Sequence, residues 1–193
     1  MAWRDESEWE KDWWGTCQNT YAEEAKQQVY AEKMGLKATA LDGKYPVYDL
    51  EGASVLDIGG GPVSMLLKGV HYGDCLVADP CNYPSWINER YKEAGIGYLK
   101  KKGEDLELVG YDEVWIYNVL QHTDEPHKIA RNALRAGKIV RVFEWIDTYV
   151  SKGHPHVLTE KHLNKWFKGE GRVETLNDRG CRGKAWYGVF KGV

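Results

Sequence analysis

Long apolar runs are absent from the sequence, and their absence argues against a membrane-spanning helix. No stretch approaches the roughly 18 consecutive apolar residues that such a helix requires. The first residues, Met1–Ser7, also lack the basic and then apolar layout of a signal peptide. We therefore expect a cytoplasmic protein that has no membrane partner.

Positive charge is not in excess either. The chain has 26 Lys and Arg residues against 29 Asp and Glu residues, which gives a formal net charge of -3 at pH 7. A protein with this balance lacks the basic surface that attracts a phosphate backbone. The one lysine run, Lys100–Lys102, is typical of a solvated surface. Nucleic acid is therefore not an expected partner.

Cysteine is scarce, and repeats, low-complexity tracts and Pro- or Ser-rich linkers are missing. The four cysteines form no Cys-x-x-Cys pair, so their spacing fits neither a disulfide framework nor a closed zinc site, and we expect reduced thiols. A chain of 193 residues without linkers is expected to be one compact domain. Within it, residues 1–45 are interpreted as an N-terminal helical cap on a domain at residues 46–193.

Charge is distributed unevenly along the chain. Residues 1–32 contain eight acidic and three basic residues, whereas residues 151–193 contain four acidic and nine basic residues. Opposite charges attract, so the two ends of the chain are expected to lie close together.

Short apolar segments alternate with segments of helical composition. The expected strands are 53–58, 75–79, 97–100, 113–117 and 138–143, with a closing hairpin at 172–176 and 185–191. The expected helices are 20–34, 63–68, 84–94, 125–135 and 159–168, and 103–106 is expected to be a turn. This alternation predicts an α/β fold with a Rossmann-like, doubly wound and mostly parallel sheet of seven strands, the last one reversed.

Glycines follow the first strand of this predicted sheet. Gly59, Gly60 and Gly61 come directly after Asp57-Ile58, and Asp79 ends the second strand 20 residues after Gly59. Ligands of such sheets bind beyond the carboxyl ends of the strands, where glycine lets a ligand approach the backbone. An acid at this separation is typical of ribose recognition. The pattern therefore indicates an adenosine-type cofactor, either NAD or S-adenosylmethionine.

Two features favour S-adenosylmethionine over NAD. The NAD fingerprint Gly-x-Gly-x-x-Gly is incomplete, because Ser64 stands at its last position. A carboxylate at Asp57 would also repel a pyrophosphate and attract an ammonium or sulfonium group.

At this point residues 53–168 resemble the class I S-adenosylmethionine-dependent methyltransferases, in particular their small-molecule members. The resemblance rests on four ordered blocks, Val55–Gly61, Val77–Pro80, Gly103–Leu106 and Tyr111–His122, the last followed by Asp124–Pro126. His156–Leu163 is similar to the segment that opens the last helix of these enzymes. One departure is Val63, which stands where the family often has a third glycine.

The resemblance implies a cofactor, S-adenosyl-L-methionine, with S-adenosyl-L-homocysteine as its product, and a role for each matching residue. Gly59, Gly60 and Gly61 would pass under the methionine part, and Asp57 would organise its ammonium end. The remaining roles are Asp79 on the ribose, Pro80 on the adenine face, Glu104 or Asp105 on the adenine amino group, and the backbone of Asn118 near the sulfonium.

Methyl transfer is an in-line displacement at an activated methyl group, so the protein supplies alignment, exclusion of water and, for a hydroxyl nucleophile, a base. His122, His154 and His156 are the candidate bases, since imidazole titrates near neutral pH. For each of them the alternative is a purely structural role, as a capping or packing histidine. The chemistry requires no metal. A site made by Glu160, His162 and the His154 and His156 pair is disfavoured, because alternate residues of an extended loop point to opposite sides.

The leading hypothesis is methyl transfer to a small-molecule acceptor through an oxygen or nitrogen nucleophile. The alternatives are a non-catalytic S-adenosylmethionine-binding partner subunit and, less favoured, an NAD-dependent oxidoreductase. The Trp-rich N-terminus, Trp3 to Trp14, is interpreted either as a lid over the cofactor or as simple packing. An aromatic patch among nine tryptophans makes a homodimer an open possibility.

Overall fold

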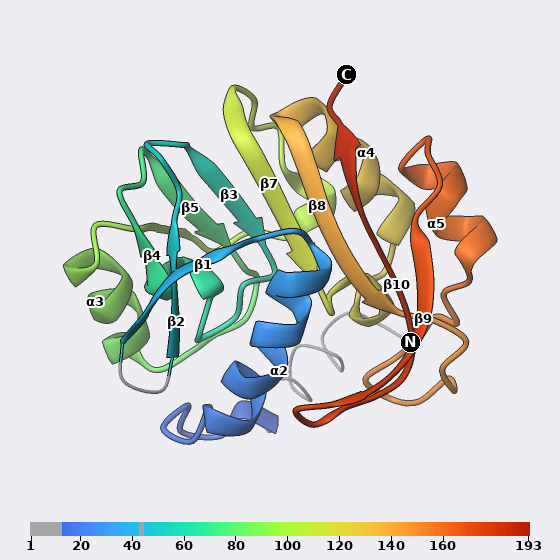
Figure 1. Cartoon of the computed structure of the whole chain (residues 1–193), viewed down its shortest axis with the longest axis horizontal. Helices are drawn as coiled ribbons and strands as arrows, with labels where there is room; N and C mark the ends of the chain where they lie inside the picture. The colour runs from blue at the N-terminus through green and yellow to red at the C-terminus, as the bar shows by residue number, and fades with distance from the viewer. Residues whose placement is uncertain (1–12, 43–44) are drawn as a thin grey trace.

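A computed structural model describes residues 13–42 and 45–193 of the chain. Its central sheet has seven strands in the order β6-β5-β3-β7-β8-β10-β9 (Figure 1). These strands are β3 (Val55–Ile58), β5 (Cys75–Ala78), β6 (Gly97–Leu99), β7 (Tyr111–Tyr117), β8 (Gly137–Trp145), β9 (Arg172–Asp178) and β10 (Cys181–Lys191). Neighbouring strands from β6 to β8 are parallel, and β10 runs antiparallel to both β8 and β9. The predicted mostly parallel sheet with a reversed last strand is confirmed.

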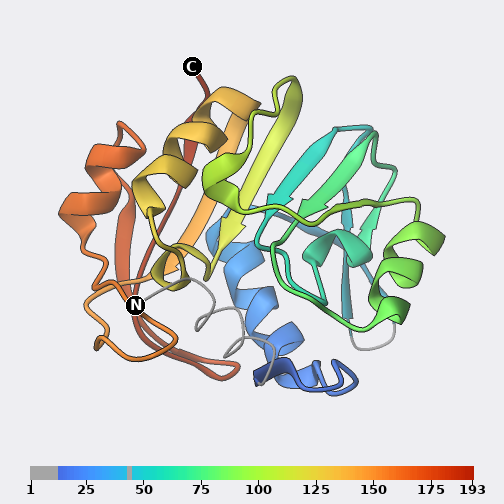
Figure 2. The same ribbon diagram turned by 180° about the vertical axis from the view of Figure 1, so that it is seen from behind.

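Helices cover both faces of this sheet. They are α2 (Tyr21–Lys33), α3 (Ser85–Glu93), α4 (Pro126–Ala136) and α5 (Glu160–Trp166). Figure 2 shows α4 and α5 in front of the sheet and α2 behind it. Among the described residues, no helix combines the length and the apolar character needed to cross a membrane.

Alternating side chains of the central strands divide the hydrophobic core in two. Val55 of β3 belongs to the core that contains Tyr30 of α2 and Tyr91 of α3. Leu56 and Ile58 of the same strand belong to the core formed with α4 and α5. This division follows from the two-residue period of a strand, which sends successive side chains to opposite faces. The four cysteines are buried, and no disulfide joins them.

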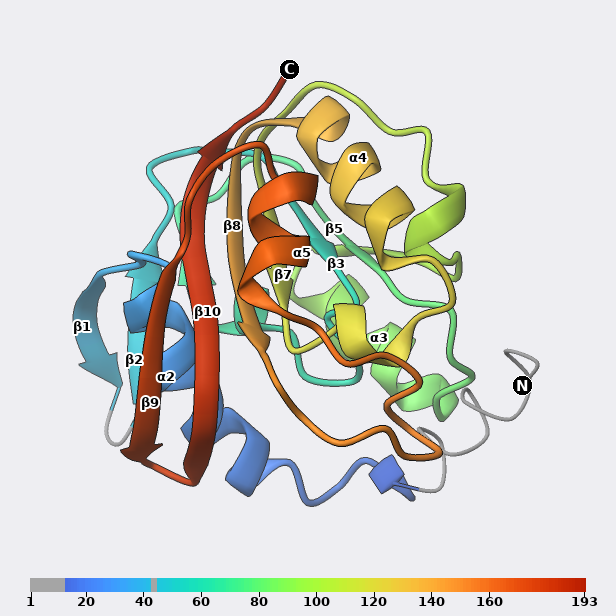
Figure 3. The same ribbon diagram turned by 90° about the vertical axis from the view of Figure 1, so that its right-hand side faces the viewer.

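The described parts of the two chain ends lie together; most of the N-terminal acids lie in residues 1–12, outside the described residues, and of the two ion pairs that follow only Glu32 with Arg179 has the predicted signs. Figure 3 shows α2 beside the β9–β10 hairpin. Lys33 Nζ lies 2.6 Å from Glu174 Oε2, and Arg179 Nη2 lies 2.7 Å from Glu32 Oε2. Partly exposed ion pairs of this kind contribute about 0–1 kcal/mol each to the free energy of unfolding. They therefore help to orient α2 on the hairpin but add little to the stability of the fold.

Two local expectations are wrong or incomplete. The segment 63–68 is not an α-helix: Ser64 caps a single 3₁₀ turn, η1 (Met65–Lys68), and Pro62 precedes that cap. The chain must become extended directly afterwards, because β4 (Gly69–Val70) pairs in parallel with β2 (Tyr45–Asp49). The small sheet β1-β2-β4, in which β1 is Ala38–Asp42, was not expected from the sequence.

Candidate functional site

A cavity of about 480 Å³ lies at the carboxyl ends of β3, β5 and β7. Its lining includes Gly59–Gly61 after β3, Asp79–Cys81 after β5, and Asn118–Val119 after β7. From β3 the chain adds β5 and β6 on one side of the sheet and then β7 and β8 on the other side. Open α/β sheets bind their ligands at the point where the strand order changes direction in this way. The structure therefore brings the predicted glycine loop and the predicted ribose acid into one cavity.

The glycine loop is closely packed from behind. Gly59 has φ +77°, and a Cβ at this position would lie 2.5 Å from a methyl carbon of Val119. Gly61 also has a positive φ, +62°, which favours glycine. A Cβ on Gly60 would lie 2.5 Å from Asp57 Oδ2. The sequence uses glycine here because the backbone itself forms the cavity wall.

Asp57 lies beneath this loop and not in the cavity wall. Its side chain is fully buried, and Oδ2 accepts hydrogen bonds from Ser64 Oγ and Tyr117 OH, both at 2.5 Å. Burial raises the pKa of Asp57 to about 7, although these two donors act in the opposite direction. Asp57 is thus not among the described residues that line the cavity, and its expected role at the ammonium end of the cofactor stays a prediction.

Asp79 does line the cavity and is 5% exposed. Its Oδ2 accepts from the Gly61 N–H at 3.1 Å, and its Oδ1 accepts from the Cys81 N–H at 2.9 Å. Burial raises the pKa of this carboxyl, while the two backbone donors lower it. Each carboxylate oxygen can accept more than one hydrogen bond, so both can still accept from a ligand hydroxyl.

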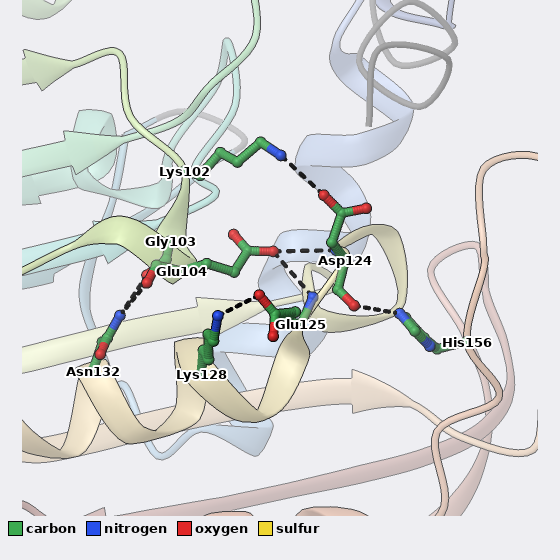
Figure 4. Close-up of polar contacts among 8 residues, drawn as sticks. All are labelled: Lys102, Gly103, Glu104, Asp124, Glu125, Lys128, Asn132 and His156. Atoms are coloured by element: carbon green, nitrogen blue, oxygen red, sulfur yellow. Dashed lines mark hydrogen bonds and ion pairs between the residues drawn. The ribbon is translucent and has the colours of Figure 1, made fainter. Parts of the chain in front are cut away.

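The two candidate adenine acids separate in the structure. Glu104 lines the cavity, whereas Asp105 is exposed and is not among the lining residues of the described chain. Figure 4 shows the Glu104 carboxylate directed at the start of α4, where Oε1 accepts from the backbone N–H groups of Asp124 and Glu125 at 3.1 and 3.3 Å. Pro80 also lines the cavity, as predicted.

The turn after β7 is held by a buried acid that the sequence analysis did not single out. Glu144 of β8 is fully buried, and its Oε1 accepts from the N–H groups of Val119 and Leu120, both at 3.0 Å. Burial raises the pKa of Glu144 to about 8. Asn118 lines the cavity with φ +57°, and its Oδ1 accepts from Gln121 Nε2 at 2.8 Å.

Of the three candidate bases, two meet in the cavity and one does not. His122 and His154 both line it, with ring centroids 4.6 Å apart. His156 lies outside the lining, as far as the chain is described, and its Nε2 donates to the Asp124 carbonyl oxygen at 3.1 Å (Figure 4). The late loop thus divides its two histidines, as the alternation of an extended segment predicts.

The environment of His122 fixes its protonation. Its Nδ1 lies 2.6 Å from the carbonyl oxygen of Gly153, which can only accept, so Nδ1 carries the proton and Nε2 the lone pair. Burial lowers the pKa of His122 to about 3, and His154 acts in the same direction. Burial also lowers the pKa of His154. Both imidazoles are therefore neutral at neutral pH.

The opposite side of the cavity comes from parts of the chain without a motif. Trp13 and Trp14 line it, while Trp3 lies outside the described residues. Further lining residues come from α2, from the end of β8 and the segment after it, and from the start of β10; among them are Gln27, Tyr30, Trp145, Thr148, Arg182 and Lys184. Sequence reasoning missed these residues because no spacing links segments so far apart.

Comparisons with known proteins agree with this geometry at the level of the fold. No protein-family model and no curated protein matches the chain. Solved structures do match it. Magnesium protoporphyrin IX methyltransferase (ChlM) from Synechocystis PCC 6803, solved with bound S-adenosylhomocysteine, aligns with a TM-score of 0.59 at 13% identity over 89% of this chain and 84% of its own.

Two further solved structures, a methyltransferase in a complex and a cyclase, also match the fold. A putative methyltransferase solved in complex with the Haloferax volcanii Trm112 methyltransferase activator aligns with a TM-score of 0.58 at 12% identity, over 90% of this chain and 96% of that one. The [4+2]-cyclase SpnF aligns with a TM-score of 0.56 at 16% identity, over 78% of this chain and 57% of its own. The chain has the fold of the class I S-adenosylmethionine-dependent methyltransferases.

Proposed function

We propose that this protein binds S-adenosyl-L-methionine and transfers its methyl group to a small-molecule acceptor. The observation that carries the proposal is the convergence of the glycine loop, Asp79, Pro80, Glu104 and Asn118 on one cavity at the switch point of the sheet. The fold alone would not suffice, because one fold can support several reactions.

The residues of the cavity fit this cofactor. A Cβ on Gly59 would already collide with Val119, so the loop presents bare backbone to the methionine part. Asp79 would accept from the ribose hydroxyls, and Pro80 would lie on the adenine face. Glu104, rather than the exposed Asp105, would accept from the adenine amino group, since its Oε2 is not used in holding α4.

Asp57 would act as a positioning residue. Its carboxyl fixes Ser64 and Tyr117, and Tyr91 OH completes the same network by donating to the Gly61 carbonyl oxygen at 2.8 Å. This network would hold the loop in the shape that receives the ammonium end of the cofactor, with Asn118 near the sulfonium.

When bound, the cofactor supplies a methyl group on a positively charged sulfur that an in-line nucleophile displaces. The residues of this chain would align the acceptor and exclude water. The unprotonated Nε2 of His122 lies 3.4 Å from Gln121 Nε2, and it could accept a hydrogen bond from an acceptor O–H or N–H in place of this amide. A site with pKa about 3 does not retain the proton, so we propose that His122 orients the nucleophile and that the proton passes to water.

Calorimetric titration with S-adenosylhomocysteine beside NADH tests the proposed cofactor. We expect micromolar binding of S-adenosylhomocysteine and no binding of NADH. Binding of NADH alone would instead support an oxidoreductase.

Burial lowers the pKa of both cavity histidines and so weakens them as bases, which favours one alternative, a subunit that binds the cofactor without turnover. Methyl transfer from labelled S-adenosylmethionine to a panel of phenols and amines separates the two. Product formation would exclude the non-catalytic alternative, whereas cofactor binding without any product would favour it.

A further inference from the structure

A row of polar contacts runs along the cavity wall from the loop after β8 to the turn after β7. It joins the Gly153 carbonyl oxygen to His122 Nδ1 at 2.6 Å, His122 Nε2 to Gln121 Nε2 at 3.4 Å, and Gln121 Nε2 to Asn118 Oδ1 at 2.8 Å. His122, Gln121 and Asn118 all line the cavity. The proposed function assigns a role to His122 but none to the two amide side chains.

One end of this row fixes the direction of donation along it. The Gly153 carbonyl oxygen can only accept, so His122 Nδ1 donates to it and His122 Nε2 carries a lone pair. The amide atom of Gln121 that faces this lone pair must therefore be the nitrogen. The amide atom of Asn118 that faces the Gln121 nitrogen must in turn be the oxygen Oδ1. A backbone carbonyl thus sets the orientation of both amides.

Gln121 holds this orientation through its nitrogen alone. The residue is 2% exposed, and its Oε1 is buried without a hydrogen-bond partner among the described residues. Turning the amide over would place Oε1 against two acceptors, Asn118 Oδ1 and His122 Nε2, which is unfavourable. The observed orientation is therefore the one that these contacts favour.

Asn118 is left with a donor at the cavity. Because its Oδ1 accepts from Gln121, its Nδ2 occupies the other branch of the amide. Within residues 13–42 and 45–193, Nδ2 forms no hydrogen bond, and it is not a buried atom. Asn118 lines the cavity, so its N–H groups are accessible to a ligand there.

From this arrangement we propose that the methyl acceptor is an alcohol or a phenol, whose hydroxyl oxygen accepts a hydrogen bond from Asn118 Nδ2. A hydroxyl has one O–H and two lone pairs. The O–H donates to His122 Nε2 in place of the Gln121 amide, one lone pair accepts from Asn118, and the other attacks the methyl group. Gln121 keeps its shorter bond to Asn118 and acts as a positioning residue. This inference rests on the proposed function and specifies its nucleophile.

An amine does not fit the same groups. A neutral amine nitrogen has a single lone pair, and the attack on the methyl group requires it. The Asn118 amide would then face a nitrogen that cannot accept, and a donor left unpaired in a closed site is unfavourable. The Asn118 side chain therefore selects an oxygen nucleophile over a nitrogen nucleophile.

The transfer balances without a further reagent. The oxygen lone pair forms the bond to the methyl carbon while the bond from this carbon to sulfur breaks, and its electron pair stays on sulfur. The hydroxyl proton leaves its hydrogen bond with His122 and passes to water, because burial keeps the pKa of this imidazole low. The products are the methyl ether, S-adenosylhomocysteine and a hydrated proton.

The test lets an oxygen and a nitrogen compete within one molecule. The probes are 3-aminophenol and 3-aminobenzyl alcohol, each of which has a hydroxyl and an aryl amine that is uncharged at neutral pH. They are incubated with the protein and S-adenosylmethionine that carries an isotopically labelled methyl group, and carbon NMR separates O-methyl from N-methyl products. We expect the O-methyl product in at least about tenfold excess, although the amine is the stronger nucleophile in solution.

Asn118→Asp tests the donor itself. Asn118 has φ +57°, which Asp also tolerates, so the variant keeps the backbone and nearly the same shape. The new carboxylate repels an oxygen lone pair and can accept from an N–H, so the ratio of O-methyl to N-methyl product should fall by at least about tenfold. Gln121→Leu should lower the ratio as well, because it no longer holds the Asn118 amide.

Asn177→Asp is the matched control. Asn177 is an exposed residue of β9 and is outside the cavity lining of the described chain. This variant makes the same chemical change away from the cavity, so it should keep the wild-type product ratio.

An excess of N-methyl product in the wild type, or an unchanged ratio in Asn118→Asp, would overturn the proposal. If neither probe is methylated, proton–nitrogen NMR of the protein saturated with S-adenosylhomocysteine decides, with the Asn118 side-chain amide identified by its loss in Asn118→Asp. A shift of this signal with phenol but not with aniline would support the proposal, and any other response would overturn it.

Failure of the wild type to bind S-adenosylhomocysteine would instead contradict the proposed function. The same NMR titration with phenol and aniline on the ligand-free protein would then still decide whether the Asn118 amide selects a hydroxyl.

Discussion

At the scale of single residues, Gly59 combines two constraints that can be separated experimentally. Its φ of +77° disfavours any side chain, and a Cβ would also meet the Val119 methyl groups at 2.5 and 2.7 Å. Gly95, with φ +71° but nothing within 4 Å of its Cβ position, has only the first constraint. The pair therefore distinguishes backbone strain from the close approach that shapes the cavity.

Gly59→Ala should destabilise the protein more than Gly95→Ala does. We expect Gly95→Ala to cost about 1 kcal/mol of unfolding free energy, and Gly59→Ala to cost about 1–3 kcal/mol beyond that because Val119 must move. Denaturant unfolding measures both, and only Gly59→Ala should also weaken S-adenosylhomocysteine binding. Equal losses of unfolding free energy in the two variants would show that the Val119 side chain moves away from the new Cβ without an energetic cost.

The protonation of His122 is a second residue-scale prediction. Because burial lowers its pKa to about 3, its ring signals in an NMR titration should not change between pH 8 and pH 5. The unfolded chain binds a proton at this site near pH 6.5, so the folded state holds fewer protons between about pH 6.5 and 3, and stability falls as pH falls through that window. His122→Gln should lose this part of the pH dependence. A midpoint near 6.5 for His122 would contradict the account.

At the scale of elements, Glu144 joins the end of β8 to the turn after β7. Its Oε1 holds the N–H groups of Val119 and Leu120, and Val119 in turn packs behind Gly59. The sequence did not reveal this link, because a single Glu inside an apolar strand has no signal that names its partners. The link connects two parallel strands to the glycine loop of a third.

Glu144→Gln should make stability less dependent on pH. Burial raises the pKa of Glu144 from 4.5 to about 8, so the folded state holds more protons than the unfolded chain between these values, and stability falls as pH rises through that window. Gln keeps an oxygen for both N–H groups but does not titrate. The variant should therefore gain stability relative to the wild type from pH 6 to pH 9 in chemical unfolding.

Asp57 provides the control for this comparison. It is retained in the variant, and with its pKa raised to about 7 it contributes a slope of the same sign to both proteins. The difference between the wild type and Glu144→Gln is therefore due to Glu144. Parallel stability curves over this range would show that Glu144 is already ionised in the folded state.

The same scale shows why one predicted helix failed. Residues 63–68 have helical composition, but the next two residues pair with β2, and the chain has room for only one 3₁₀ turn before them. Local propensity was overridden by pairing with a distant strand. By contrast, the helix expected at 84–94 forms as α3 because apolar Ile87 and Tyr91, four residues apart, share one buried face.

At the scale of the whole molecule, sequence patterns predicted the sheet and the side of the cavity formed by the loops after β3, β5 and β7, but not its opposite side. The cofactor residues follow strands, so their positions at one edge of the sheet are a consequence of parallel topology. The opposite side of the cavity includes residues of α2, of the end of β8 and of the start of β10, and only the closed fold places these elements around one cavity. The uneven charge of the two ends predicted that they would meet, and the Glu32–Arg179 pair has the predicted signs, but charge composition contains no information on which residues pair.

The central claim is that Asp79 and the glycine loop form an S-adenosylmethionine site. Calorimetric titration of S-adenosylhomocysteine into ligand-free wild type, Asp79→Ala and Asp105→Ala tests it most directly. Asp105 is a matched control, because it is an exposed acid outside the described lining of the cavity. The account predicts micromolar binding by the wild type, the same affinity for Asp105→Ala, and binding weaker by roughly tenfold or more for Asp79→Ala. Wild-type affinity in Asp79→Ala, or no binding by the wild type, would contradict it.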